Sequence, residues 1–141
     1  MRTEHLQNVH AGWVVAGWLV AAAVTSLVLI ALAGLGIVGA GDMAPGWSLL
    51  AVLAGFYVGG MFTGFRSIDA PILHGIAIGI FSLVAWLVLN VIATAFFPEA
   101  SWQTLSPTAS SAILLLQLAA AVGGAWTGHV IALRGGPDVT D

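Results

Sequence analysis

The chain has 141 residues, of which 60% are apolar and only 6% are charged, and its mean hydropathy is +1.04. A water-soluble protein carries charge on about a quarter of its residues, so this composition excludes an ordinary soluble fold. The absence of cysteine excludes disulfides and thiolate chemistry. A formal net charge of −3, scattered along the chain, gives no reason to expect nucleic acid as a partner, whereas a lipid bilayer fits the composition.

Four apolar runs, taken in chain order, are each long enough to cross a bilayer, which needs about 20 mainly apolar residues. We predict spans at about residues 11–33, 47–65, 71–97 and 107–133, the last two beginning at Pro71 and Pro107. Backbone groups in lipid must be satisfied within their own segment, so these runs are predicted to be helices. We therefore expect an all-α protein, with residues 1–141 forming a single membrane domain and an integral membrane four-helix bundle.

The basic residues predict the orientation of this bundle. Four spans place both termini and the turn after Arg66 on one side of the membrane, and Arg2, Arg66 and Arg134 all fall on that side. The positive-inside rule makes this side cytoplasmic, so both termini are expected to be cytoplasmic. The first run has no small-residue cleavage pattern at its end, which favours a retained span over a signal peptide.

An internal repeat joins the two halves of the chain. Val58 to Gly64 reads VGGMFTG and Val122 to Gly128 reads VGGAWTG, an offset of 64 residues that also carries His10 onto His74. We interpret the chain as a duplicated helical hairpin with units at residues 10–66 and 74–134. Because each unit holds two spans, both units insert the same way round, about a pseudo-two-fold axis along the membrane normal.

The glycines of the spans fall into small-residue stripes, which include the GxxxG pairs Gly60–Gly64, Gly75–Gly79 and Gly124–Gly128. Small residues let helices approach closely in lipid, so we predict that these stripes pack the second, third and fourth spans together. The alternative is a flat surface for a ring-shaped cofactor or a neighbouring subunit. The predicted packing residues are Gly55, Gly59, Gly60, Thr63, Gly64, Gly75, Gly79, Gly123, Gly124, Thr127 and Gly128.

Three histidines are expected near the cytoplasmic face, one on each of the first, third and fourth spans: His10, His74 and His129. Imidazole is the usual axial ligand of haem iron, so a haem or a related macrocycle could lie between two of them, with His74 and His129 as the preferred pair. The alternative is that each histidine hydrogen-bonds to water, lipid headgroups or backbone carbonyls at the interface.

Ionisable side chains are missing from the middle of every predicted span, which argues against proton- or ion-coupled transport. The larger polar residues there are Asn90 and Gln117, which we expect to bond across helices, with a polar pore lining as the alternative. No nucleophile, base and orienting group can be placed together, so no catalytic residues are predicted, and no metal site either.

The stretch from Gly59 to Gly75, GGMFTGFRSIDAPILHG, resembles a pattern found in small bacterial four-span membrane proteins of unknown activity. That pattern has a GGxxxGR helix end, a short turn, and HG opening the next helix; here Phe65 separates Gly64 from Arg66. The resemblance implies a stand-alone bundle in a bacterial plasma (inner) membrane, and it carries over no catalytic residue.

The leading functional hypothesis is a non-enzymatic accessory, assembly or scaffold subunit that packs against other membrane protein subunits, or against itself, through its glycine-rich helices. Its short extramembrane parts favour this hypothesis. One alternative is a haem- or pigment-binding membrane protein that uses the histidines. Another is a small homo-oligomeric channel or transporter lined by Asn90 and Gln117.

Overall fold

All four predicted spans are helices in the computed structural model, which describes residues 9–37, 45–67, 69–96 and 107–135. The helices are α1 (Ala11–Gly34), α2 (Pro45–Arg66), α3 (Pro71–Phe96) and α4 (Pro107–Arg134). Their ends lie within two residues of the predicted span ends. Each helix is long and apolar enough to cross a membrane, which confirms the prediction of an all-α protein with four candidate spans.

Local sequence explains where these helices begin and end. Proline is the first residue of α2, α3 and α4, a position where its missing N–H costs nothing and its fixed φ suits a helix. α1 ends in a Schellman turn in which Gly36 adopts a positive φ of 69°. The amide of Ile37 donates to the carbonyl of Leu32 and the amide of Gly36 to that of Ala33, both at 3.0 Å.

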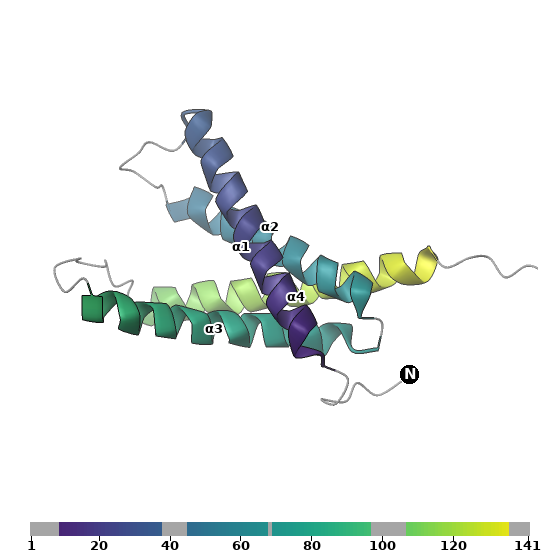
Figure 1. Ribbon diagram of the computed structural model, residues 1–141. Coiled ribbons are helices and arrows are strands. Elements are labelled where there is room, and N and C mark those ends of the chain that lie inside the picture. Colours follow the sequence, from purple (N-terminus) through teal and green to yellow (C-terminus); the bar gives the residue numbers. More distant parts are fainter. Residues whose placement is uncertain (1–8, 38–44, 68, 97–106, 136–141) are drawn as a thin grey trace, which may run out of the picture.

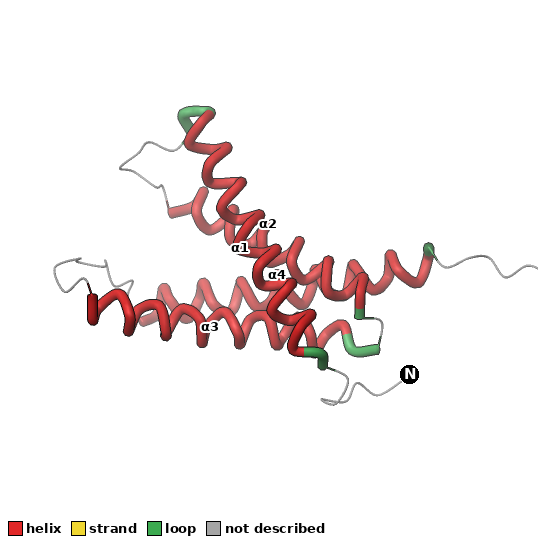
Figure 2. The backbone as a smooth tube through the Cα atoms, in the orientation of Figure 1, coloured by secondary structure: helices red, strands yellow, loops and turns green. Residues whose placement is uncertain are grey.

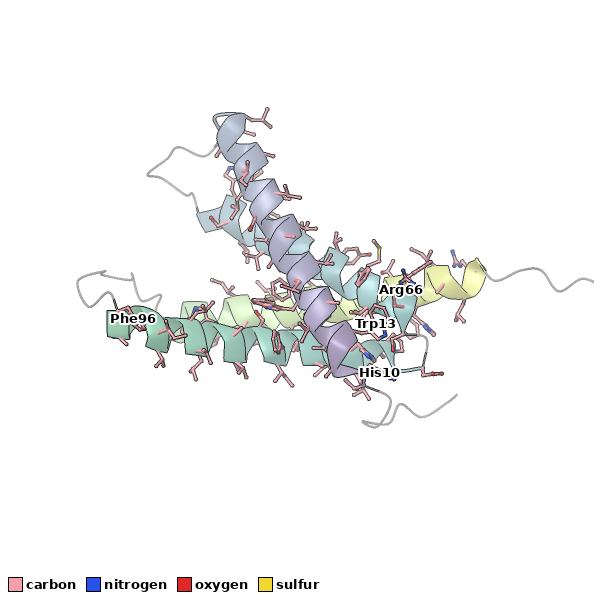
Figure 3. All side chains as sticks on the ribbon, viewed as in Figure 1. His10, Trp13, Arg66 and Phe96 are labelled. Atoms are coloured by element: carbon pink, nitrogen blue, oxygen red, sulfur yellow. The ribbon has the colours of Figure 1, made fainter. Side chains whose placement is uncertain are left out.

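The helices alternate in direction along the chain, and α2 contacts each of the other three. The starts of α1 and α3 and the end of α2 lie together at one end of the bundle, which we call the histidine end, and the end of α4 projects beyond them on the same side (Figures 1 and 2). His10, Trp13 and Arg66 gather there, whereas Phe96 lies at the opposite end (Figure 3). Away from the histidine end, α1 and α3 diverge (Figure 1).

A seam of glycines joins α2 and α4. A Cβ atom at any of four glycines would lie too close to a carbonyl oxygen of the opposite helix, so only glycine fits at these points. Such close backbone approach supplies van der Waals contact in lipid. We call this contact the glycine seam; its pairs are Gly60 with Ala121, Gly64 with Ala125, Gly124 with Tyr57 and Gly128 with Met61.

The pairs of the glycine seam exchange under the 64-residue offset. Gly60 on α2 and Gly124 on α4 are 64 residues apart, and so are Tyr57 on α2 and Ala121 on α4. The pair Gly60–Ala121 is therefore equivalent to the pair Gly124–Tyr57, with the roles of α2 and α4 exchanged. The other two pairs are related in the same way. α2 and α4 therefore meet through equivalent residues, as the two sides of a two-fold interface do.

In the first hairpin, α1 packs on the Gly55–Gly59 face of α2. A Cβ on Gly59 would meet Cβ of Ala21 at 2.8 Å, and a Cβ on Gly17 would meet the carbonyl oxygen of Gly59 at 3.1 Å. The first hairpin is therefore closed by glycines from both of its helices.

In the second hairpin, the glycines come from α3 alone. A Cβ on Gly75 would meet Cα of Val122 at 2.7 Å, and a Cβ on Gly79 would meet Cδ1 of Leu118 at 2.6 Å. Gly123, the residue of α4 equivalent to Gly59, has only Cε2 of Tyr57 near it, at 4.0 Å. The α4 face that corresponds to the α1-binding face of α2 is therefore left uncovered by α3.

Candidate functional site

The buried polar site at the histidine end is built around His74, whose side chain has no exposed surface. The ring Nδ1 lies 2.8 Å from the carbonyl oxygen of Ala70 and 3.3 Å from Oγ of Ser67. The ring Nε2 lies 3.2 Å from the backbone amide nitrogen of His10. We call His10, Ser67, Ala70 and His74 the histidine corner, because together they tie the start of α1 to the turn between α2 and α3.

The partners of His74 determine where its proton lies. The carbonyl oxygen of Ala70 can only accept a hydrogen bond, so Nδ1 carries the hydrogen and donates it. The amide of His10 can only donate, so Nε2 has a free lone pair and accepts. The observed geometry therefore requires a neutral imidazole protonated at Nδ1, and both ring nitrogens are engaged within the protein.

His10 contributes to the corner with its ring as well as its amide. Its ring stacks on that of His74, with centroids 6.3 Å apart and an interplanar angle of 13°. One turn further along α1, Trp13 packs edge-on against Phe62. The guanidinium of Arg66 lies over the Trp13 ring, 5.8 Å from its centroid (Figure 3). Trp13 and Arg66 thus add a second link between the start of α1 and the end of α2.

His129 makes its ring contact elsewhere. It packs against Trp126 on its own helix, with ring centroids 5.9 Å apart. Its Nδ1 is buried and has no hydrogen-bond partner among the described residues. The structure therefore pairs His74 with His10, its equivalent in the repeat, rather than with His129, the partner preferred from sequence.

A haem between His74 and His129 would need a free nitrogen on each ring. Nε2 of His74 accepts from the His10 amide and Nδ1 donates to Ala70, so coordination of iron would break one of these bonds. The corner is chemically suited to a different task. It satisfies the amide of His10, the N-cap residue of α1, for which no side chain within α1 forms a cap.

Two polar side chains deeper in the bundle are paired within it, whereas the buried Oγ1 of Thr25 has no hydrogen-bond partner among the described residues. Gln117 on α4 is buried and donates from Nε2 to Oγ of Ser82 on α3 at 2.5 Å. The side chain of Asn90, the other predicted polar contact, lies outside the described residues. Thr63 donates to the carbonyl of Gly60 at 2.7 Å, so its hydroxyl is satisfied by its own helix.

The predicted packing glycines lie between helices of this chain, with one exception. Gly60, Gly64, Gly124 and Gly128 form the glycine seam, whereas the stripe from Gly55 to Thr63 faces α1, a helix that the sequence analysis left out of the packing. The exception is Gly123, where an added Cβ would meet only Cε2 of Tyr57, at 4.0 Å. Thr127, one turn further on, accepts a 2.9 Å hydrogen bond from the hydroxyl of Tyr57 and donates to the carbonyl of Gly123.

Sequence reasoning missed Gly17, Ser67 and Tyr57. Gly17 lies outside any GxxxG pair, but its spacing of four from Ala21, which also faces α2, was a usable signal. Ser67 lies in a turn seven residues before His74, and nothing in the sequence indicates that its hydroxyl is directed to that ring.

Comparison of the chain with protein-family models, with curated protein sequences and with solved structures gives no match in any of the three. The resemblance of Gly59 to Gly75 to small bacterial four-span proteins therefore stays a prediction.

Proposed function

We propose that this protein is a non-enzymatic accessory or scaffold subunit that binds another membrane protein through the far half of α3. Between Leu83 and Phe96 every described side chain except that of Ala85 is exposed. A helix within a self-sufficient bundle buries one face against its neighbours. The far half of α1, by contrast, keeps a half-buried face that includes Val28, Leu29 and Leu32.

The four glycines of the glycine seam support this proposal, because they already contact the opposite helix of the same chain. The glycine seam is closed within the chain, so its four glycines are covered and a partner has to meet other surface. The far half of α3 offers Trp86 and long aliphatic side chains, and aromatic residues of this kind often anchor protein interfaces. A partner helix packed there would give this half of α3 the buried face that the described residues of the other helices do not provide.

The two alternatives have less support. A macrocycle-binding protein would need His74 to give up a hydrogen bond at a fully buried ring. A channel would need a continuous polar path, but Gln117 and Ser82 bond to each other between α3 and α4, and glycine contacts close α2 against α4. We therefore rank both below the accessory subunit.

The proposal includes the setting and origin of the chain. We infer that it lies in a bacterial plasma membrane with both termini cytoplasmic, which is supported by Arg66 and Arg134 at the histidine end. We also infer that its two hairpins, residues 10–66 and 74–134, arose by duplication. The exchange of the seam pairs under the 64-residue offset supports that inference, and so does the stacking of His10 on His74.

The test is purification of the tagged protein from its native membrane in mild detergent. We expect a colourless preparation that holds another membrane protein in fixed stoichiometry. The double variant Trp86→Ala, Leu87→Ala on α3 should lose that protein, whereas the matched variant Leu27→Ala, Ile30→Ala on α1 should keep it. Recovery of the wild-type chain alone, or equal loss in both variants, would contradict the proposal.

A further inference from the structure

The start of α1 depends on a residue of another helix. The amides of Trp13 and Val14 donate to the carbonyl of His10, as expected for a helix start, but no side-chain cap is formed at this end of α1. The amide of His10 itself donates to Nε2 of His74 on α3. A hydrogen bond to a ring nitrogen therefore ties the first residue before α1 to α3.

A second proton on His74 would destroy this bond. The Nε2 lone pair that accepts from the His10 amide is the only place where the neutral ring can take a proton, because Nδ1 already carries its hydrogen. Protonation would set an N–H group of the ring against the N–H group of His10, so this hydrogen bond could no longer form. Histidine is the side chain whose charge most readily changes between about pH 5 and pH 8.

Other ionisable groups lie near the same end of the bundle. Among the described residues these are His10 at the start of α1, Arg66 at the end of α2, Asp69 in the following turn, and His129 and Arg134 on α4. A proton on the stacked ring of His10 would add repulsion to a charged His74, acting in the same direction. The experiment therefore has to separate the rings of His10 and His129 from that of His74.

We propose that His74 is a proton-operated latch: its neutral ring holds the start of α1 against the start of α3, and protonation at Nε2 releases it. The ring stacking of His10 on His74 and the edge contact of Val9 with the core would be lost in the same movement. The latch is independent of the accessory function, because it rests on the histidine corner and not on the far half of α3.

The experiment measures the position of α1 with two spin labels. The chain has no cysteine, so Gly12→Cys and Gly135→Cys introduce the only thiols. A side chain at Gly12 has no neighbour within 4 Å, and one at Gly135 meets only a carbonyl oxygen at 3.6 Å. By electron–electron distance measurement in nanodiscs we expect a narrow distribution at about pH 8 and loss of that narrow peak at about pH 5.

Four variants show which histidine causes the loss of the narrow peak at about pH 5. His74→Gln keeps a neutral oxygen acceptor and should stay narrow at both pH values. His10→Ala removes the stacked ring but keeps the amide, and His129→Ala removes the imidazole on α4, so both variants should retain the loss of the narrow peak at about pH 5. His10→Pro removes the donor N–H and should be broad at both pH values. A transition that survives in His74→Gln, or wild-type behaviour in His10→Pro, would overturn the latch.

Two further measurements guard against unfolding. A label pair at Gly46→Cys and Gly135→Cys omits α1 and should stay narrow throughout. If His74→Gln fails to fold, ¹⁵N spectra of histidine-labelled wild-type protein answer the question directly. Nε2 of His74 should become protonated over the same pH range as the loss of the narrow peak, and protonation at a clearly different pH would overturn the proposal.

Discussion

The two hairpins carry similar seven-residue motifs, VGGMFTG and VGGAWTG, but they pack on different faces of their helices. In the first, α1 sits on the glycine face of α2, with Gly17 close to Gly59. In the second, α3 avoids Gly123, the equivalent of Gly59, and brings Gly75 and Gly79 against α4 instead. In each hairpin the first helix makes its close approach at its own glycines, Gly17 in α1 and Gly75 and Gly79 in α3.

Single residues explain this difference. The equivalent of Gly17 in the second hairpin is Phe81, which is too large for the gap that Gly17 occupies against Thr63 and Gly59. Phe81 packs edge-on against Trp18 of α1 instead, with ring centroids 5.3 Å apart. The second hairpin gains its close approach from the glycines at 75 and 79, where the first has Ala11 and Val15.

The largest effect is expected in the contact that the two hairpins share. Gly60→Ile and Gly124→Ile would each drive a branched side chain into the backbone of the opposite helix, costing about 3 kcal/mol of unfolding free energy. Gly123→Ile is the matched control, because it adds the same side chain next to Gly124 where a Cβ would meet no backbone atom of another helix within 4 Å. Reversible unfolding in mixed detergent and SDS micelles measures all three. Equal losses at Gly123 and Gly124 would contradict the seam.

A somewhat smaller loss of unfolding free energy should follow when Gly17 of the first hairpin is replaced by phenylalanine, the residue at the equivalent position 81 of the second. Gly17→Phe places a ring against Thr63 and Ile78, and we expect it to cost about 2 kcal/mol. Gly12→Phe, on the same helix but with no neighbour within 4 Å of its Cβ, should cost much less. The same unfolding measurement compares the two variants. An unchanged unfolding free energy in Gly17→Phe would show that glycine at position 17 is not needed for α1 to pack on α2.

The smallest effect concerns the polar contact of the second hairpin. Ser82→Ala and Gln117→Leu should each cost about 0.6 kcal/mol, the usual size of a hydrogen bond between membrane helices. The double variant should cost less than the sum of the two, because both changes remove one bond. A double-mutant cycle measures this coupling, and strictly additive losses would show that the bond contributes nothing.

Much of the fold followed from the sequence because the bilayer leaves few choices. Runs of apolar residues predicted the four helices to within two residues at each end, since prolines and glycines mark those ends. The glycines of α2 and α4 were foreseeable as packing positions, because close contact in lipid needs small residues. The face that each hairpin covers was harder to foresee, since it depends on helix rotation and on a single residue such as Phe81.

The histidine site shows the limit of sequence reasoning more clearly. Three histidines at one end suggested a shared ligand, but only the structure shows the His74 ring engaged by the amide of His10 and the carbonyl of Ala70. Backbone groups carry no sequence signature. The sequence did relate His10 to His74 through the 64-residue offset, and these are the two residues whose rings stack.

The most direct test of the accessory function is site-specific photocrosslinking in the native membrane. Leu27 follows the first residue of α1, Ala11, by the same 16 positions as Leu87 follows Pro71, and both side chains are exposed. A photoreactive residue at position 87 is predicted to capture one defined protein, while the same residue at 27 yields only lipid adducts. Lipid adducts alone at both positions would contradict the proposed docking surface on α3.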